Sequence, residues 1–179
     1  LEDADPVDGA TSRVVKFYRP ARWSDEQILE EHAFAAELAS NEIPVIAPLV
    51  LESGATLLFG GGFRFAVYPR QGGRVPELDN IREGRPMRER IGQFIARIHR
   101  IGERAPFASR PAIDAATDSA RAIEQVLASR LLPIELEPAW VAIAEQCASA
   151  CAQAFARAGE GGTRPLRLHG DCHLGNLLW

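Results

Sequence analysis

The chain has 179 residues, of which 46% are hydrophobic and 25% charged, a composition typical of a globular protein that can bury a core. Twenty basic residues against 24 acidic ones give a net charge of −4, and no apolar run approaches the roughly 20 residues that span a bilayer. These features argue against nucleic acid or a membrane as a partner, and three cysteines do not form a disulfide framework. We therefore expect a cytoplasmic protein that is a monomer.

The first 68 residues carry the signals of a small antiparallel sheet with one helix. An Asp-Gly pair within residues 7–10 predicts a hairpin turn, and the β-branched and aromatic run Arg13–Tyr18 predicts a strand. Ser24 is a candidate N-cap with Gln27 at the capping-box position, so a helix is expected from there to about Ser40. Three further strands are expected, at Ala47–Leu51, Ala55–Phe59 and Phe63–Tyr68.

The second part of the chain is expected to be mainly helical. Pro69–Pro76 has the glycine and proline content of a linker. Periodic apolar residues then predict helices at Met87–Glu103, Ala115–Ser129 and about Glu137–Ala158. A loop at Gly159–Pro165 and a short strand at Leu166–Leu168 follow. The sequence therefore predicts an α+β, two-lobed fold, with lobes at 1–68 and 77–179, a hinge at 69–76 and a cleft between the lobes.

The clearest chemical signal is the spacing His169-x-Asp171-x-x-x-x-Asn176, which follows the last expected strand. Transfer of a phosphoryl group from ATP needs a carboxylate near the acceptor hydroxyl and an oxygen ligand for the magnesium ion that neutralises the phosphates. Catalytic loops of protein kinases supply these groups as an aspartate and, five positions later, an asparagine. Asp171 and His169 are therefore candidate catalytic residues, and Asn176 is the candidate magnesium ligand.

Two other interpretations of this segment stay open. Gly, Asp and Asn are common turn residues, so the run could be a plain surface turn. Alternatively, a zinc ion could be held by four residues of the run, His169, Asp171, Cys172 and His173. Turn chemistry does not account for the two histidines, however, and adjacent residues rarely point at one ion. The chain also lacks a second Cys/His cluster that would complete a zinc site.

Lys16 stands out because it is the single lysine among the 20 basic residues. On the expected strand it shares a face with Val14 and Tyr18. An ammonium group is a compact charge suited to phosphate oxygens, whereas the wider fork of arginine would fill the space differently. Lys16 is therefore a candidate ligand of the ATP phosphates. The alternative is a lysine on an edge strand that only extends into solvent.

Glu31 is the candidate partner of Lys16, because kinase sites orient the strand lysine with a glutamate from the next helix. Glu31 shares a helix face with Ile28, Ala35 and Leu38, so it is expected to point toward the sheet. Its neighbour Glu30 is expected to point about 100° away. The alternative for Glu31 is a solvated charge on a polar helix.

The glycine-rich segments contribute weaker signals. Gly60–Gly62 lacks the GxGxxG spacing and a following helix, so a hairpin turn is favoured over a phosphate cradle. Gln71–Arg74 is expected to form the linker, whose backbone groups could meet an adenine. Tyr68 and Arg70, which come just before Gln71, are further candidates for binding the nucleotide.

The run Leu168–Asn176, Leu-His-Gly-Asp-Cys-His-Leu-Gly-Asn, resembles the catalytic loop of the aminoglycoside phosphotransferase/choline kinase-like superfamily. Ile91–His99 is similar to that family's helix ending in Leu/Ile-His. The similarity covers nearly the whole chain and is weaker across Arg104–Pro165. It is closer to the bacterial stress-response kinases of this superfamily at Val14–Pro20, Trp23, Ile28–His32, Phe63–Arg74 and Leu166–Trp179.

This resemblance implies a serine/threonine protein kinase of the bacterial cytoplasm that depends on ATP and magnesium and acts in stress survival. By position, Asp171 would accept the proton of the substrate hydroxyl or orient it, and Asn176 would bind magnesium. Lys16 would hold the ATP phosphates, with Glu31 as its partner.

The resemblance also implies that the chain is incomplete at both ends. The family's nucleotide-covering hairpin is expected before Leu1, and its second magnesium ligand, an aspartate, after Trp179. A kinase of small alcohols such as aminoglycosides, choline or homoserine is the alternative function. A nucleotide-binding pseudokinase is a third, and the intact Lys16, Asp171 and Asn176 count against it.

Overall fold

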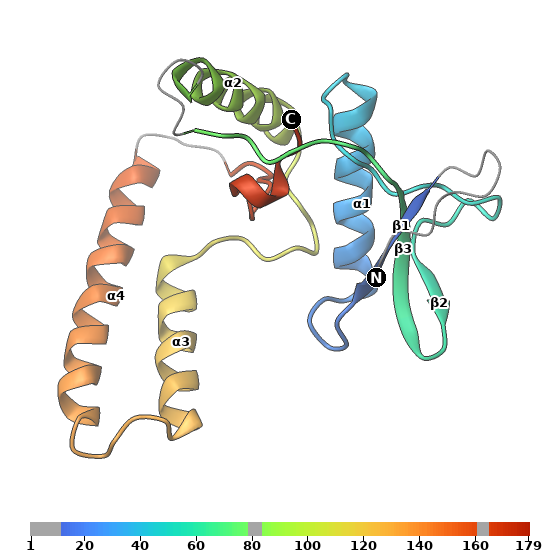
Figure 1. Cartoon of the computed structure of the whole chain (residues 1–179). Coiled ribbons are helices and arrows are strands. Elements are labelled where there is room, and N and C mark those ends of the chain that lie inside the picture. Colours follow the sequence, from blue (N-terminus) through green and yellow to red (C-terminus); the bar gives the residue numbers. More distant parts are fainter. Residues whose placement is uncertain (1–11, 79–83, 161–164) are drawn as a thin grey trace. The chain divides into compact units, whose positions relative to one another are not determined.

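A computed structural model describes residues 12–78, 84–160 and 165–179 of the chain. The hairpin turn expected at residues 7–10 lies outside these ranges. The described part contains a small antiparallel sheet and four α-helices (Figure 1), so the predicted α+β class is confirmed. None of the described helices is both long and apolar enough to cross a membrane.

The sheet has three strands, β1 (Arg13–Tyr18), β2 (Leu58–Gly60) and β3 (Phe63–Pro69), in the order β1-β3-β2 with antiparallel pairing throughout. β2 and β3 form a hairpin, as expected from the glycine run. Gly61 and Gly62 turn it with positive φ angles of 57° and 79°, a region that residues with a side chain rarely adopt.

Two of the expected strands are wrong or shortened. Ala47–Leu51 is not a strand: Leu49 donates a backbone hydrogen bond to Val67 of β3 at 2.8 Å, but Pro48 has no N–H with which to continue a ladder. The strand expected at Ala55–Phe59 begins only at Leu58. Ala55 is instead part of a turn, in which its carbonyl oxygen accepts a hydrogen bond from Leu51 N at 3.0 Å.

The helix α1 (Asp25–Ser40) begins and ends where the sequence predicts. Its capping box is present: the Ser24 hydroxyl accepts from Gln27 N at 3.3 Å, and the Gln27 side chain accepts from Ser24 N at 2.9 Å. Ile28 of α1 packs into the first buried cluster, which is formed by Tyr18, Ile28, Leu57 and Ala66. Further along, α1 packs into the second buried cluster, which is formed by Phe34, Leu38, Ile43, Ile98 and Ile101.

The second cluster joins α1 to the helix α2 (Gly84–Gly102), which begins three residues before the expected Met87. The strand expected at Leu166–Leu168 is wrong. This segment lies along the end of α2, where Arg167 N donates to Gly102 O at 3.3 Å, and it has no partner strand among the described residues. A 3-10 turn, η1 (Leu174–Asn176), follows it.

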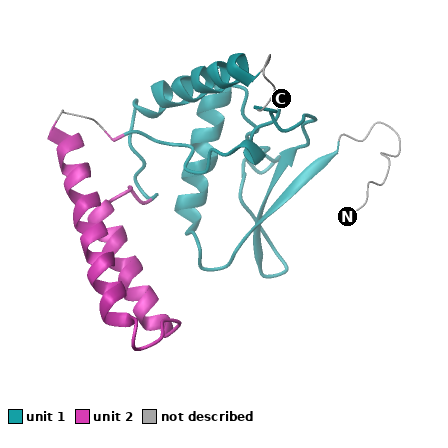
Figure 2. Cartoon of the chain, turned by 60° about the vertical axis from the view of Figure 1, so that its left-hand side comes forward, with its two compact units in different colours: residues 1–110, 166–179 teal, residues 111–165 magenta. Residues whose placement is uncertain are grey.

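The remaining helices are α3 (Ala115–Ser129), which has the expected bounds, and α4 (Glu137–Glu160), which ends two residues later than expected. The chain forms two compact units (Figure 2), residues 1–110 with 166–179, and residues 111–165. These units are divided differently from the predicted lobes, because α2 and the 169–176 segment belong with the sheet and α1. The lobes and the hinge stay predictions.

Candidate active site

Lys16 and Glu31 meet as the sequence predicts. Lys16 lies in the middle of β1, opposite Ala66 of β3. Its Nζ donates to Glu31 Oε1 at 2.9 Å and lies 4.9 Å from the centre of the Tyr18 ring. Both side chains are partly exposed, 47% for Lys16 and 34% for Glu31, so the ammonium group remains accessible to a ligand.

A third charged residue, Arg110, completes this cluster and was not found from the sequence. Its Nη1 lies 2.9 Å from the second carboxylate oxygen of Glu31, so a different cation binds each oxygen. The guanidinium also stacks 4.5 Å from the centre of the Trp23 ring. Burial raises the pKa of the Glu31 carboxyl, but the hydrogen bond from Lys16 and the charges of Lys16 and Arg110 outweigh it and hold that pKa below its ordinary value.

Glu30 fixes the segment that carries Arg110. Its carboxylate accepts hydrogen bonds from three consecutive backbone N–H groups, those of Ala108, of Ser109 at 2.9 Å and of Arg110 at 2.8 Å. Burial raises the pKa of this carboxyl, but the three N–H groups outweigh it and lower the pKa overall. Helical geometry predicts from the sequence that Glu30 and Glu31 point in different directions. The sequence does not show that Glu30 has partners about 80 residues away.

A buried polar network lies beneath Lys16. The Tyr18 hydroxyl is 2.7 Å from His32 Nε2 and 3.2 Å from the Tyr68 hydroxyl, and His32 Nδ1 is 2.8 Å from Thr56 Oγ1. Burial lowers the pKa of His32, the nearby Glu31 charge opposes this, and the net shift is downward. Burial and the Tyr68 contact raise the pKa of Tyr18. Tyr68, a predicted nucleotide ligand, thus contacts Tyr18, whose ring lies beneath the Lys16 ammonium group.

The 169–176 segment is a compact loop held by its own polar groups. The Asn176 side-chain amide donates to Asp171 Oδ2 at 3.0 Å and to Asp171 O at 2.9 Å. His169 Nδ1 accepts from Asp171 N at 3.3 Å, and His173 Nδ1 accepts from Gly175 N at 3.1 Å. The Asp171 side chain is 77% exposed. The loop therefore holds Asp171 and Asn176 together and presents the carboxylate to solvent.

The hydrogen bonds of the 169–176 loop bear on the two metals proposed for it from the sequence, zinc and magnesium. Across residues 12–78, 84–160 and 165–179, no group of three or more His, Cys, Asp or Glu side chains is placed to hold a metal ion, so the zinc alternative gains no support. Asn176 uses its amide N–H groups toward Asp171, which leaves its amide oxygen outside that hydrogen bond. An amide oxygen is a hard donor of the kind that binds magnesium.

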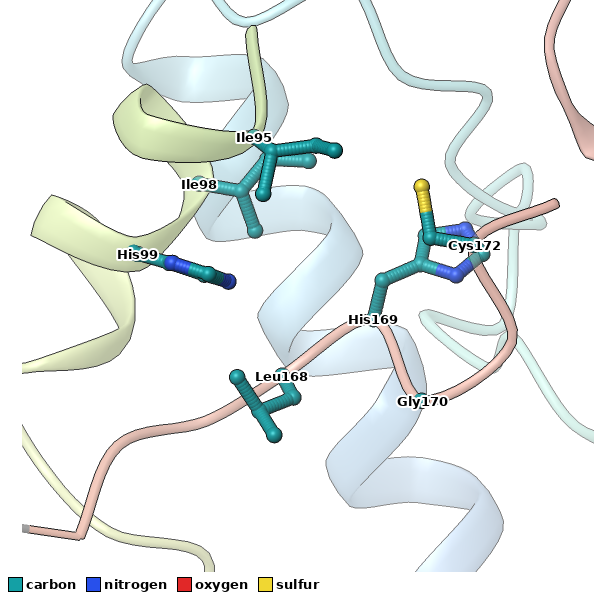
Figure 3. Close-up of a pocket in the computed structure, with 7 residues that line it drawn as sticks. All are labelled: Ile95, Ile98, His99, Leu168, His169, Gly170 and Cys172. Atoms are coloured by element: carbon teal, nitrogen blue, oxygen red, sulfur yellow. The ribbon is translucent and has the colours of Figure 1, made fainter. Parts of the chain in front are cut away.

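A pocket of about 190 Å³ lies between α2 and the start of this loop (Figure 3). α2 contributes Ile95, Ile98 and His99, and the opposite wall is formed by Leu168, His169, Gly170 and Cys172. His169 and Cys172 both line this pocket, so the loop faces α2 with residues on both sides of Asp171.

The predicted hinge contacts the residues that follow the loop. Arg74 N donates to Trp179 O at 3.1 Å, and Trp179 N donates back to Arg74 O at 2.9 Å. Gly73 permits this close approach, because a Cβ there would lie 2.8 Å from Leu178 Cβ. Arg70, the other predicted nucleotide ligand, donates its backbone N–H to Ser12 O at 3.2 Å beside β1.

The predicted site residues therefore fall into two groups. Lys16, Glu31 and Tyr68 gather where β1, β3 and α1 meet, while His169, Asp171 and Asn176 gather in the loop that follows α4 in the chain. Among the described residues, no hydrogen bond or ion pair joins Lys16 or Glu31 directly to the loop.

Comparison with known proteins gives a consistent result. Residues 6–179 match the phosphotransferase enzyme family. Stress response kinase A of Escherichia coli is 42% identical to the chain over 166 residues, which are 93% of this chain and 48% of that protein. The serine/threonine protein kinase RdoA of Salmonella typhimurium is 40% identical over the same shares. The chain thus spans about half the length of the curated relatives it matches.

Proposed function

The chain belongs to the phosphotransferase enzyme family, and on that premise we propose that its full-length gene product transfers the terminal phosphoryl group of ATP to serine or threonine hydroxyls of proteins. We also propose that it acts in stress response, as the names of its relatives indicate, and that it lies in the cytoplasm, as its sequence indicates. The observation that carries the proposal is the 2.9 Å contact between Lys16 and Glu31. A phosphate-binding lysine needs such a partner to hold its ammonium in place.

Lys16 binds and orients the nucleotide phosphates in this proposal. Glu31 holds the ammonium by one carboxylate oxygen, while Arg110 fixes the other, so the lysine is positioned before the nucleotide arrives. Because the pKa of Glu31 is held low, its carboxylate stays charged at neutral pH. The nucleotide base is assigned to the linker, with Tyr68 and Arg70 at its start.

Asp171 accepts or orients the proton of the attacking hydroxyl. Its exposed carboxylate can be reached by a serine or threonine side chain, and the Asn176 amide restrains it from one side. His169 supports the same residue by accepting its backbone N–H. Asn176 would bind magnesium through its amide oxygen, and magnesium, when bound, supplies the positive charge that neutralises the phosphates.

The test is phosphate transfer by the full-length gene product with magnesium and ATP labelled in the γ-phosphate. Acceptors are the protein itself, dephosphorylated casein, and a panel of aminoglycosides, choline and homoserine. We expect label on serine or threonine of protein, and none when Asp171→Asn replaces the wild type. Turnover of one small alcohol without protein labelling would establish the small-molecule alternative, and no transfer to any acceptor would establish a pseudokinase.

A further inference from the structure

Arg167 is a buried charge that the catalytic proposal does not use. Only 9% of the residue is exposed, although it lies two residues before His169. Its Nη1 donates to Glu37 Oε2 at 2.7 Å, and its Nη2 donates to Ile101 O at 3.0 Å. The guanidinium also stacks 4.3 Å from the centre of the Phe34 ring. Burying a guanidinium is costly unless it is paired, so this geometry requires both partners.

The backbone at Arg167 is fixed as firmly as the side chain. Its N–H donates to Gly102 O at 3.3 Å, at the last residue of α2. A Cβ on Gly102 would lie 2.3 Å from Arg167 O, so the two chain segments touch through their backbones. The approach to the catalytic loop is therefore held by the end of α2 and by a side chain of α1.

α1 carries both glutamates that matter for the site. Glu31 binds Lys16, and Glu37, six residues further along the same helix, binds Arg167. Six residues span about 9 Å of helix rise. A single rigid element thus contacts the phosphate-binding lysine at one place and the entry to the catalytic loop at another, although the two groups share no direct hydrogen bond among the described residues.

We propose that Arg167, acting through Glu37, is a positioning residue that sets the 169–176 loop relative to the Lys16–Glu31 pair. The inference rests on the proposed phosphotransfer function for its effect on rate. A misplacement of about 1 Å at a reacting centre can cost about 100-fold in rate, so the position of Asp171 relative to Lys16 is a requirement of transfer. Arg167 does not touch the substrate in this proposal.

The test uses the full-length gene product and two variants that remove the link. Glu37→Ala changes a side chain that is 30% exposed and removes the partner of Arg167. The double variant Arg167→Met with Glu37→Met removes the whole ion pair and keeps apolar volume, a replacement that is often neutral for stability. Arg104→Met is the matched control, because Arg104 contacts the same Glu37 carboxylate at 3.7 Å but is 52% exposed.

The first readout is steady-state transfer. We expect kcat to fall by about 10-fold or more in both variants, with KM for ATP changed less than about threefold, because the loop moves while the lysine keeps its partner. Arg104→Met should leave both constants unchanged. Wild-type kcat in either variant would overturn the proposal, since a purely structural pair would change stability and leave the turnover of folded protein intact.

The second readout, amide hydrogen exchange, does not depend on catalysis. We expect the amides of Gly175 and Asn176 to exchange about 10-fold faster in both variants, while the amides in the first half of α1 stay protected. Unchanged exchange in the loop would also overturn the proposal. If wild-type protein transfers no phosphate but the loop exchange rises as expected, the proposed function fails and the positioning role of Arg167 stands.

Discussion

The two groups of site residues are built in different ways. The charged cluster around Glu31 joins residues that are 15 and 79 positions apart in the chain. The hydrogen bonds that the structure shows within the 169–176 loop join residues at most five positions apart. A locally closed loop can form a fixed shape by itself, but its position relative to the lysine depends on long-range anchors.

Exposure follows the same division. The Glu31 side chain is bound by two cations and is 34% exposed, whereas the Asp171 side chain is 77% exposed. The loop is anchored from outside by Arg167 at its start and by the pairing of Trp179 with Arg74 after its end. The Lys16–Glu31 cluster is therefore held by long-range contacts, while the 169–176 loop is held at its two ends and exposes the Asp171 carboxylate to solvent between them.

Asp171→Asn is expected to have the largest effect, because in the proposed function it removes the carboxylate that accepts the proton of the attacking hydroxyl. We expect kcat of the full-length gene product to fall by about 10²–10⁴-fold. Asp118→Asn, on α3, is the matched control and should keep wild-type turnover. Single-turnover transfer by Asp171→Asn within a few-fold of wild type would show that the loop does not perform the chemistry.

The Lys16–Glu31 pair should show energetic coupling if the nucleotide side acts as one unit. A double-mutant cycle of Lys16→Met and Glu31→Gln on kcat/KM is expected to give a coupling energy of about 0.5–3 kcal/mol. Lys16→Arg should also be poorly tolerated, because charge alone does not satisfy the site. Strictly additive single effects would mean that the two residues act independently.

The anchoring of the loop by backbone contact can be tested by two glycines of α2. Gly102→Ala would push a Cβ into Arg167 O and should lower the free energy of unfolding by about 1–3 kcal/mol. Gly92→Ala meets no atom within 4 Å and should raise it by about 0.5–1 kcal/mol through helix propensity. Urea unfolding of both variants measures the contrast, and equal effects would show that the Gly102 contact is absent.

The buried network under Lys16 should give the smallest effect, a pH dependence of stability. Burial holds the pKa of His32 below its ordinary value of about 6.5, so the unfolded chain binds a proton that the folded chain resists. The contribution of His32 to stability is therefore complete above about pH 6.5 and is lost as the pH falls below it. Urea unfolding from pH 8 to pH 5 should show this loss in wild type and a weaker one in His32→Gln. Identical profiles for the two proteins would show that His32 does not cause the pH dependence of stability.

Local signals explain what the sequence could predict. The capping box at Ser24 and Gln27 places the start of α1 correctly, because both hydrogen bonds close within three residues. The periodicity of side chains along a strand and along a helix also predicts the faces on which Lys16 and Glu31 lie, and the two residues do meet. The strand expected at Ala47–Leu51 fails for a local reason as well, since Pro48 cannot donate to a ladder.

Long-range partners explain what was missed. Arg110 binds Glu31 across 79 positions, and Arg167 binds Glu37 across 130. No spacing pattern marks either arginine in a chain that uses arginine for 19 of its 20 basic residues, a count that follows from its single lysine. Only the fold shows that α1 also binds Arg167, just before the 169–176 loop.

In the proposed function, Lys16 binds the nucleotide and the 169–176 loop performs the transfer. The most direct test is calorimetric titration of the full-length gene product with magnesium-ATP, comparing Lys16→Met with Asp171→Asn. We predict that Lys16→Met weakens binding by about 10-fold or more, the equivalent of about 1.4 kcal/mol, while Asp171→Asn stays within about threefold of wild type. Wild-type affinity in Lys16→Met, or an equal loss in both variants, would contradict this division of roles.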